Sequence, residues 1–127
     1  MNNILTVFIV GIGGFIGAIF RYLAGGLIYK LSNNYYLPYG TLGVNLLGCF
    51  LIGFLGGYAD NLEMFSSKIR LFLFIGVLGG FTTFSTFGYE TIVLIRDKEI
   101  IAAFANVSLN VLLGLFLVYF GYSLTLR

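Results

Sequence analysis

The chain has 127 residues, of which 9% are charged and none is histidine, whereas hydrophobic residues make up 59%. A water-soluble domain carries about a quarter charged residues, so this chain has too few charges to cover a water-facing surface. The lack of histidine and the single cysteine exclude His-based acid–base catalysis, zinc clusters, CxxC redox motifs and an intrachain disulfide. We expect no enzyme activity. A net charge of +2 without a basic run also argues against nucleic acid as a partner.

Four long stretches of the chain carry no charge: residues 1–20, 31–59, 71–89 and 100–126. About 20 apolar residues span a bilayer as a helix. We therefore predict an all-α integral membrane protein with four transmembrane helices in a single domain that covers the whole chain. The predicted spans lie at about 4–29, 40–58, 69–95 and 100–124. The connections are short, which predicts antiparallel neighbours.

The positive charges divide almost evenly between the two ends of this bundle. Four spans place Lys68, Arg70 and Arg127 on one side of the membrane. The other side has three cations, or four if Arg21 reaches out to the interface: Lys30, Arg96, Lys98 and Arg21. The positive-inside rule therefore gives no clear orientation. This balance is typical of a chain that inserts in both orientations, although a small protein also has few charges to count.

Small residues recur at helical spacing within the spans. Three pairs of glycines lie four residues apart: Gly13 and Gly17, Gly53 and Gly57, and Gly76 and Gly80. Glycine at this spacing lets helix backbones approach closely. So many small faces on so short a chain predict tight packing and a partner subunit. The one cysteine, Cys49, falls in mid-span, where we expect a small packed side chain.

The third span contains an unusual segment, residues 79–90, with the sequence GGFTTFSTFGYE. Two adjacent glycines followed by hydroxyl and phenylalanine side chains make a poor uninterrupted helix. A break at this depth would free backbone carbonyls, which must find partners in lipid. Unwound carbonyls at the midplane often coordinate a cation. The alternative is a glycine-rich packing kink in which neighbouring hydroxyls satisfy the carbonyls.

Aromatic and hydroxyl side chains line adjacent faces beyond the two glycines. Phe84 and Phe87 are three residues apart and share a helix face, while Ser85 and Thr86 lie on the faces beside it. A phenyl ring has a positive edge, which can favour an anion while its apolar body excludes water. The alternative is ordinary packing against lipid or the core.

Thr41 and Asn45 lie four residues apart at the start of the second span. The Asn45 amide can donate hydrogen bonds to an anion or form an interhelical hydrogen bond, which is the commoner role of a membrane Asn. Arg21 and Glu90 are the charges deepest in the spans. Intramembrane charges are usually functional or paired, so these two can pair or can each lie near the membrane edge.

The fourth span has two polar stripes. Asn106, Asn110 and Gly114 form one stripe, and Phe104 and Ser108 form another on roughly the opposite side. One stripe can line a path and the other can hold a helix contact, and the sequence does not distinguish these roles.

Taken together, these motifs resemble the Fluc (CrcB) family of fluoride channels over the whole chain. The matching stretches are Gly13–Ala18 with Arg21 and Tyr22, Pro38–Asn45, and Gly79–Phe87 with Glu90. They occur in the family's order and on the corresponding spans, and the third-span string is the most specific of them.

The resemblance implies an antiparallel homodimer of dual-topology subunits with two fluoride pores. It implies a structural sodium ion at the dimer centre, held by the backbone carbonyls of Gly79 and Thr82 at the break in the third helix. The implied pore residues are Asn45, Phe84, Phe87 and Ser108, with a polar track at Thr41, Ser85 and Thr86. Some relatives have a pore tyrosine on the fourth span where this chain has Phe104, which removes a hydroxyl ligand.

The function implied is passive, fluoride-selective efflux across the plasma membrane of a bacterium or archaeon, which protects the cell from fluoride. The main alternative is a small dual-topology multidrug exporter, which would need a glutamate in the first span and usually has tryptophan. This chain has neither. A structural membrane subunit without transport is the second alternative.

Overall fold

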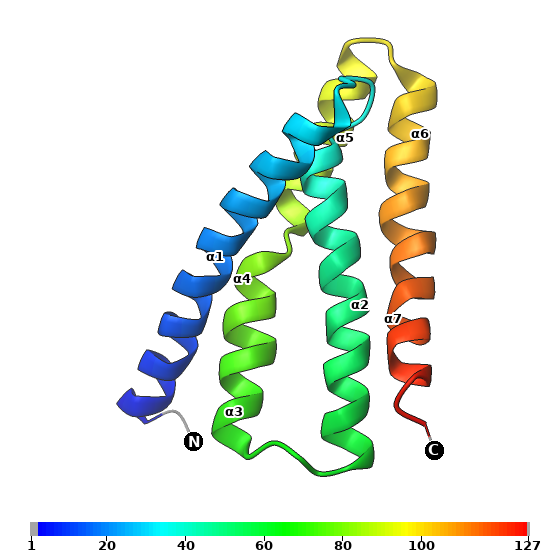
Figure 1. Cartoon of the computed structure of the whole chain (residues 1–127). Helices are drawn as coiled ribbons and strands as arrows, with labels where there is room; N and C mark the ends of the chain where they lie inside the picture. The colour runs from blue at the N-terminus through cyan, green and yellow to red at the C-terminus, as the bar shows by residue number, and fades with distance from the viewer. Residues whose placement is uncertain (1–2, 127) are drawn as a thin grey trace.

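The computed structural model describes residues 3–126, which form a helical bundle without strands (Figure 1). Four helical spans are long and apolar enough to cross a membrane: Ile4–Ser32, Tyr39–Asn61, Ser67–Arg96 and Ile100–Ser123. The prediction of four membrane-spanning helices is therefore confirmed. The described chain begins and ends at the same end of the bundle (Figure 1), as four spans require.

The first two spans are single helices, α1 (Ile4–Ser32) and α2 (Tyr39–Asn61). The third span is composed of α3 (Ser67–Arg70), η1 (Leu71–Leu78), α4 (Gly79–Phe81) and α5 (Phe84–Arg96). The fourth is composed of α6 (Ile100–Ser108), η2 (Leu109–Leu113) and α7 (Gly114–Ser123). The segments η1 and η2 are π-helical, a rare form that occurs frequently at functional sites.

Local sequence signals explain where the first two helices begin and end. The Asn3 side chain caps α1 by accepting a hydrogen bond from the Thr6 amide at 2.9 Å. Asn33 ends α1 in the left-handed conformation, with φ of 46°, which asparagine adopts more readily than most residues. Pro38 stands directly before α2, where its missing amide hydrogen costs no helical hydrogen bond.

Glycines allow two pairs of helices to pack at backbone distance. A Cβ atom on Gly13 would lie 2.6 Å from the Phe72 carbonyl oxygen of η1, so α1 and η1 are in direct backbone contact there. A Cβ atom on Gly121 of α7 would lie 2.5 Å from the Phe50 oxygen of α2. The predicted close packing is confirmed. Because these contacts lie within one chain, the glycine spacing no longer indicates a partner subunit.

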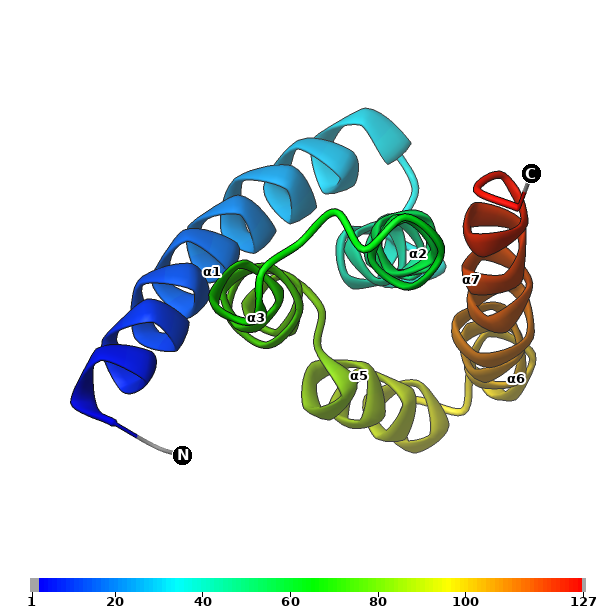
Figure 2. The same ribbon diagram turned by 90° about the horizontal axis from the view of Figure 1, so that it is seen from below.

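Helix α2 is the central element, and Figure 2 shows it between α1 and α7. In an apolar stretch of 18 residues within α2, 33% of the residues are buried, whereas the corresponding share in α1 is 11%. The α1 surface carries large exposed apolar side chains such as Phe8, Phe15 and Leu23. This surface suits contact with lipid tails rather than water.

Charged side chains are confined mainly to the two ends of the bundle. Asp60 and Arg70 form an ion pair of 3.0 Å at one end, and Arg96 and Asp97 form one of 2.9 Å at the other. All four side chains are well exposed, so each pair contributes little stability. Arg127, which enters the predicted charge balance, lies outside the described residues.

Candidate functional site

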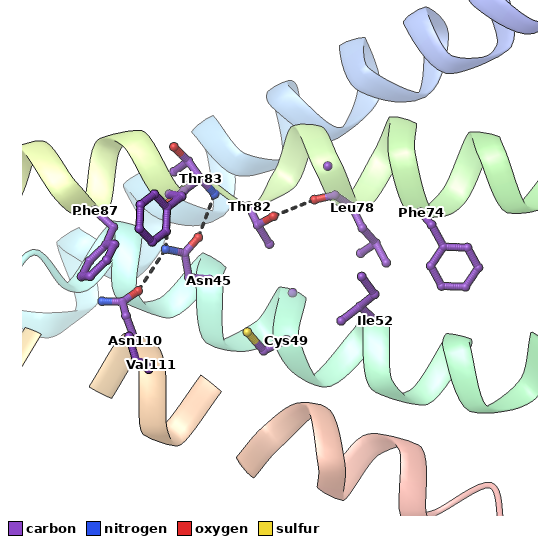
Figure 3. A pocket seen from close by; sticks show the side chains of 13 residues that line it. Asn45, Cys49, Ile52, Phe74, Leu78, Thr82, Thr83, Phe87, Asn110 and Val111 are labelled. Carbon is purple, nitrogen blue, oxygen red and sulfur yellow. Dashed lines mark hydrogen bonds between the residues drawn. The ribbon is translucent and has the colours of Figure 1, made fainter. Parts of the chain in front are cut away.

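The third span is interrupted at Thr82 and Thr83 (Figure 3). Both residues are extended, with φ and ψ of −91° and 159° at Thr82 and −151° and 120° at Thr83. The Thr82 amide and hydroxyl both donate to the Leu78 carbonyl at 3.0 Å, which completes the last turn before the break. The Thr83 hydroxyl accepts from the Thr86 amide at 3.2 Å and so caps α5.

The break therefore follows the two glycines instead of occurring at them. Gly79 and Gly80 are helical, and no glycine in residues 3–126 has a positive φ. Gly80 is required for a different reason, because a Cβ atom there would lie 2.6 Å from the Gly14 oxygen of α1. Gly80 lets α4 approach α1, and the Thr83 hydroxyl caps the next helix.

Asn45 of α2 supplies the partners that the broken backbone lacks (Figure 3). Its Oδ1 accepts from the Thr83 amide at 2.9 Å, and its Nδ2 donates to the Thr83 carbonyl at 3.0 Å. Nδ2 also donates to Oδ1 of Asn110 in η2 at 3.0 Å. Of the two roles considered for Asn45, the structure shows the interhelical one, with both of its N–H bonds in use.

The same hydrogen bond takes the Thr83 amide away from α4. In an uninterrupted helix the Thr83 amide would donate to the Gly79 carbonyl, but here it donates to Asn45. The Thr82 carbonyl belongs to extended backbone. No cluster of three His, Cys, Asp or Glu side chains that could hold a metal occurs in residues 3–126. Neutral oxygens are present at the break, both on the backbone and on the side chains of Thr82, Thr83 and Asn45.

A polar line continues from Asn110 into the interior of the bundle. Asn110 Nδ2 donates to both the carbonyl and Oδ1 of Asn106, at 2.9 and 3.1 Å. Asn106 Nδ2 donates to the Thr91 hydroxyl at 3.0 Å, and that hydroxyl donates to the Phe87 carbonyl at 2.8 Å. Asn106 is completely buried. The stripe of Asn106 and Asn110 therefore makes helix contacts, and Asn110 also reaches the cavity described next.

A cavity of about 330 Å³ opens beside the break. Its polar wall includes Asn45, Thr82, Thr83 and Asn110. The remaining wall is mostly apolar and includes both predicted aromatic residues: Gly48, Cys49, Ile52, Phe74, Leu78, Gly79, Phe84, Phe87 and Val111. Cys49 thus contributes to a cavity wall as well as to packing. No charged side chain is among these residues, so a solute here meets dipoles, rings and aliphatic side chains.

The two aromatic residues differ in exposure. Phe87 is 7% exposed, whereas Phe84 is 81% exposed. Their ring centroids are 5.4 Å apart and the ring planes are inclined by 68°, an edge-to-face arrangement. In such a pair the positive edge of one ring points at the negative face of the other. The exposed Phe84 ring needs lipid or a second copy of the chain to cover it.

A second cavity, of about 340 Å³, is lined by residues of α1, α2, the break and α5, and it shares Thr83 with the first cavity. Five of its lining residues carry a charged group or a hydroxyl: Arg21, Tyr22, Thr41, Thr83 and Thr86. The predicted polar track is therefore partly assembled here. Ser85 lies close by, with its hydroxyl 3.4 Å from that of Thr83, although it does not line either cavity.

Glu90 is held by Thr41 instead of by Arg21. The Thr41 hydroxyl donates to Glu90 Oε1 at 2.7 Å, while Oε2 is buried without a hydrogen-bond partner in residues 3–126. No ion pair joins Arg21 to Glu90 among the described residues. Of the arrangements considered for these two charges, the paired one is not formed within a subunit.

On the fourth span the structure places Asn110, and not Ser108, at the first cavity. Ser108 is half-buried at the end of α6 and lines neither cavity, and Phe104 is 76% exposed. A pore role for Ser108 therefore requires a surface formed with a second copy. The residues that the predicted site omitted are Thr83, Thr91, Asn106 and Asn110. The sequence shows that Asn106 and Asn110 share one face of the fourth span, but it does not show that this face points into the bundle.

Comparison with known proteins assigns the family. The model of the family described as "CrcB-like protein, Camphor Resistance (CrcB)" matches residues 8–122. The chain belongs to the CrcB family. A relative from Elusimicrobium minutum, "Fluoride-specific ion channel FluC", is 49% identical over 96% of this chain and 94% of its own length. The protein of the same name from Campylobacter fetus is 44% identical over 92% and 91%, and "Fluoride-specific ion channel FluC 3" from Methanosarcina barkeri is 43% identical over 95% and 90%.

The CrcB match covers the four helical spans apart from residues 4–7 and 123, and it includes every residue of both cavities. Together with the apolar helices, it identifies a multi-pass membrane protein. The resemblance stated from the sequence motifs is confirmed.

Proposed function

We propose that this CrcB protein is a fluoride-selective channel that lets fluoride leave the cell passively. The observation that carries the proposal is the near full-length similarity to relatives named fluoride-specific ion channels, at up to 49% identity. The chemistry of the two cavities supports it, because both contain hydrogen-bond donors or ring edges and neither contains a carboxylate.

The proposed path runs through both cavities and passes Thr83, which lines each of them. Arg21 places a positive charge in the second cavity, where it would draw anions in. The α5 helix begins at Phe84, so its positive dipole end faces the break. Fluoride that loses water near the break would meet these partial charges and the hydroxyl of Thr86, whereas the Thr41 hydroxyl would first have to exchange its bond to Glu90.

Selectivity follows from the size and the strength of these contacts. Fluoride is small and strongly hydrated, so only short, directed contacts can replace its water. The edges of Phe84 and Phe87 would supply weak positive contacts, and a narrow path past the two rings would exclude the larger chloride. For Asn45 to contact fluoride it must exchange the bond to Asn110, since both of its N–H bonds are in use. Conduction requires such exchangeable contacts, because an ion held too firmly would not leave.

The active unit that we propose is an antiparallel homodimer with two pores and a structural sodium ion at its centre. The 81% exposure of Phe84 supports a second copy, because a pore residue must be shielded from lipid. The Gly79 carbonyl, which receives no hydrogen bond from the Thr83 amide, and the extended Thr82 carbonyl are suitable sodium ligands, two from each chain. The ion would tie the two breaks together. The balanced charges at the two ends suit dual topology.

In acid surroundings HF would enter the cell and dissociate, and the channel would protect the cell by releasing fluoride.

The test is fluoride efflux from liposomes that contain the purified protein, read with a fluoride electrode against a chloride control. We expect rapid fluoride release without chloride release. Absence of fluoride release from folded, dimeric protein would refute the proposal and would lead to drug-transport assays for the exporter alternative. Replacing sodium by N-methylglucamine on both sides should reduce dimer stability if the ion is structural, while unchanged stability would refute that part.

A further inference from the structure

Hydrogen bonds connect the start of α5 to its second turn by a route through two other helices. We propose that this route is the device that positions Phe84 and Phe87, with Thr91 and Asn106 as its positioning residues. The inference rests on the proposed function for its meaning, but it concerns residues that no predicted site includes.

The route leaves α5 and returns to it. It begins at the Thr83 amide, which donates to Asn45 on α2, and passes to Asn110 and Asn106 on the fourth span. From Asn106 it reaches Thr91, whose hydroxyl donates to the Phe87 carbonyl. Every bond is between 2.8 and 3.1 Å. The segment that carries both rings is therefore fastened at each end to neighbouring helices.

The donors and acceptors have only one consistent arrangement. A backbone amide can only donate, so the Thr83 amide requires the oxygen of the Asn45 side chain to face it. The Asn45 nitrogen must then face Asn110, and the same logic orients Asn110, Asn106 and Thr91 in turn. Turning one amide over breaks the bonds on both of its sides. The line therefore behaves as a unit, which is the condition under which removing a distant member disturbs the others.

Thr91 and Asn106 act without touching the permeating ion. Asn106 is 0% and Thr91 8% exposed, and neither lines either cavity. Apolar residues would fill these positions without the cost of burying polar groups. The role of Thr91 and Asn106 is therefore to hold their hydrogen-bond partners in place: Thr91 holds the Phe87 carbonyl, and Asn106 holds Asn110.

The chain offers a matched control at the far end of α2. The Thr125 hydroxyl accepts from Asn61 Nδ2 at 3.1 Å and donates to the Tyr122 carbonyl at 2.7 Å. Thr125 is 5% exposed, so its bonding and burial closely match those of Thr91. Thr125→Val therefore removes an equivalent buried hydroxyl away from both cavities. Thr91→Ser keeps the hydroxyl that Thr91→Val removes.

The experiment measures two quantities on the dimer in lipid: the exchange rate of the Thr83 amide hydrogen, and the ratio of fluoride to chloride efflux. We expect Thr91→Val to raise the exchange rate and to lower the efflux ratio, each by roughly tenfold. Thr91→Ser and Thr125→Val should leave both quantities close to those of the unmodified protein. Adding Thr91→Val to Asn45→Ala should not accelerate exchange further, because the line is already cut.

Unchanged exchange in Thr91→Val, equal effects in Thr125→Val, or an additive effect on top of Asn45→Ala would each overturn the proposal. If Thr91→Val does not fold, Thr91→Cys replaces it, because a thiol is a weaker hydrogen-bonding group of similar size. It should shift both readouts less and in the same direction, and no shift would overturn the proposal. If the unmodified protein releases no fluoride, the proposed function fails, and the exchange measurement still decides whether Thr91 positions the break.

Discussion

Replacing Gly13 by alanine tests whether the glycines serve packing inside one subunit. The new Cβ atom would lie 2.6 Å from the Phe72 carbonyl oxygen and 2.9 Å from the Gly76 Cα. An ordinary contact begins at 3.4 Å, so α1 and η1 would have to separate by about 0.8 Å. Both neighbours are backbone atoms, which cannot rotate away as a side chain can. We expect the free energy of unfolding to fall by about 1–3 kcal/mol.

The assay is SDS-titrated unfolding of the purified protein, followed by helix content, with dimer content measured separately. Gly11→Ala is the matched control on the same helix, because a Cβ atom there meets nothing within 4 Å. It should be neutral or slightly stabilising, since alanine favours helix. If Gly13→Ala and Gly11→Ala have the same free energy of unfolding, the inference that α1 and η1 are in backbone contact at Gly13 is wrong. If Gly13→Ala weakens only the dimer, the glycine serves a second copy of the chain.

Three further predictions concern the two cavities. Phe87→Ala should lower the free energy of unfolding of the dissociated subunit by about 3–5 kcal/mol, because Phe87 is buried within the chain. Phe84→Ala should lower it by less than about 1 kcal/mol, because Phe84 is exposed within the chain. Both variants should reduce fluoride efflux, and equal stability losses in the subunit would contradict the burial difference. Thr41→Val should cost about 1–3 kcal/mol in SDS unfolding, because Glu90 Oε1 loses its donor, and Thr41→Ser should restore most of it. A small methanethiosulfonate reagent should attach to Cys49 and slow fluoride efflux, whereas Cys49→Ser should be insensitive; unaltered efflux after labelling would exclude the first cavity from the path.

The spans and the break could be predicted because each depends on local composition. Uncharged runs and their flanking charges locate four membrane helices, and the helices of the structure differ from the predicted spans by at most a few residues at either end. The string at residues 79–90 contains too many poor helix formers to remain continuous. These inferences need no knowledge of which residues meet across the bundle.

The exact site of the break depends on contacts that local composition does not contain. Glycine is the stronger helix breaker by propensity, yet Gly79 and Gly80 are helical and Thr83 is extended. What decides the outcome is Asn45, 38 residues earlier, which satisfies both backbone groups of Thr83. Likewise the direction of the Asn106 stripe follows from how α6 packs against α5, which sequence spacing alone left open.

The proposed path uses partial charges almost throughout, and this follows from the physics of a small anion in a membrane. A full positive charge in a narrow, water-poor passage would hold fluoride strongly, because Coulomb attraction grows as the effective dielectric constant falls. Conduction then stops, since the ion must also leave. The first cavity accordingly has amides, hydroxyls and ring edges, and Arg21 stands in the second cavity, beyond Thr83. Amides turned the wrong way would present oxygen to an anion and repel it. A passage built from dipoles therefore depends on their orientation, and the single hydrogen-bonding pattern through Asn45 and Asn110 supplies that orientation.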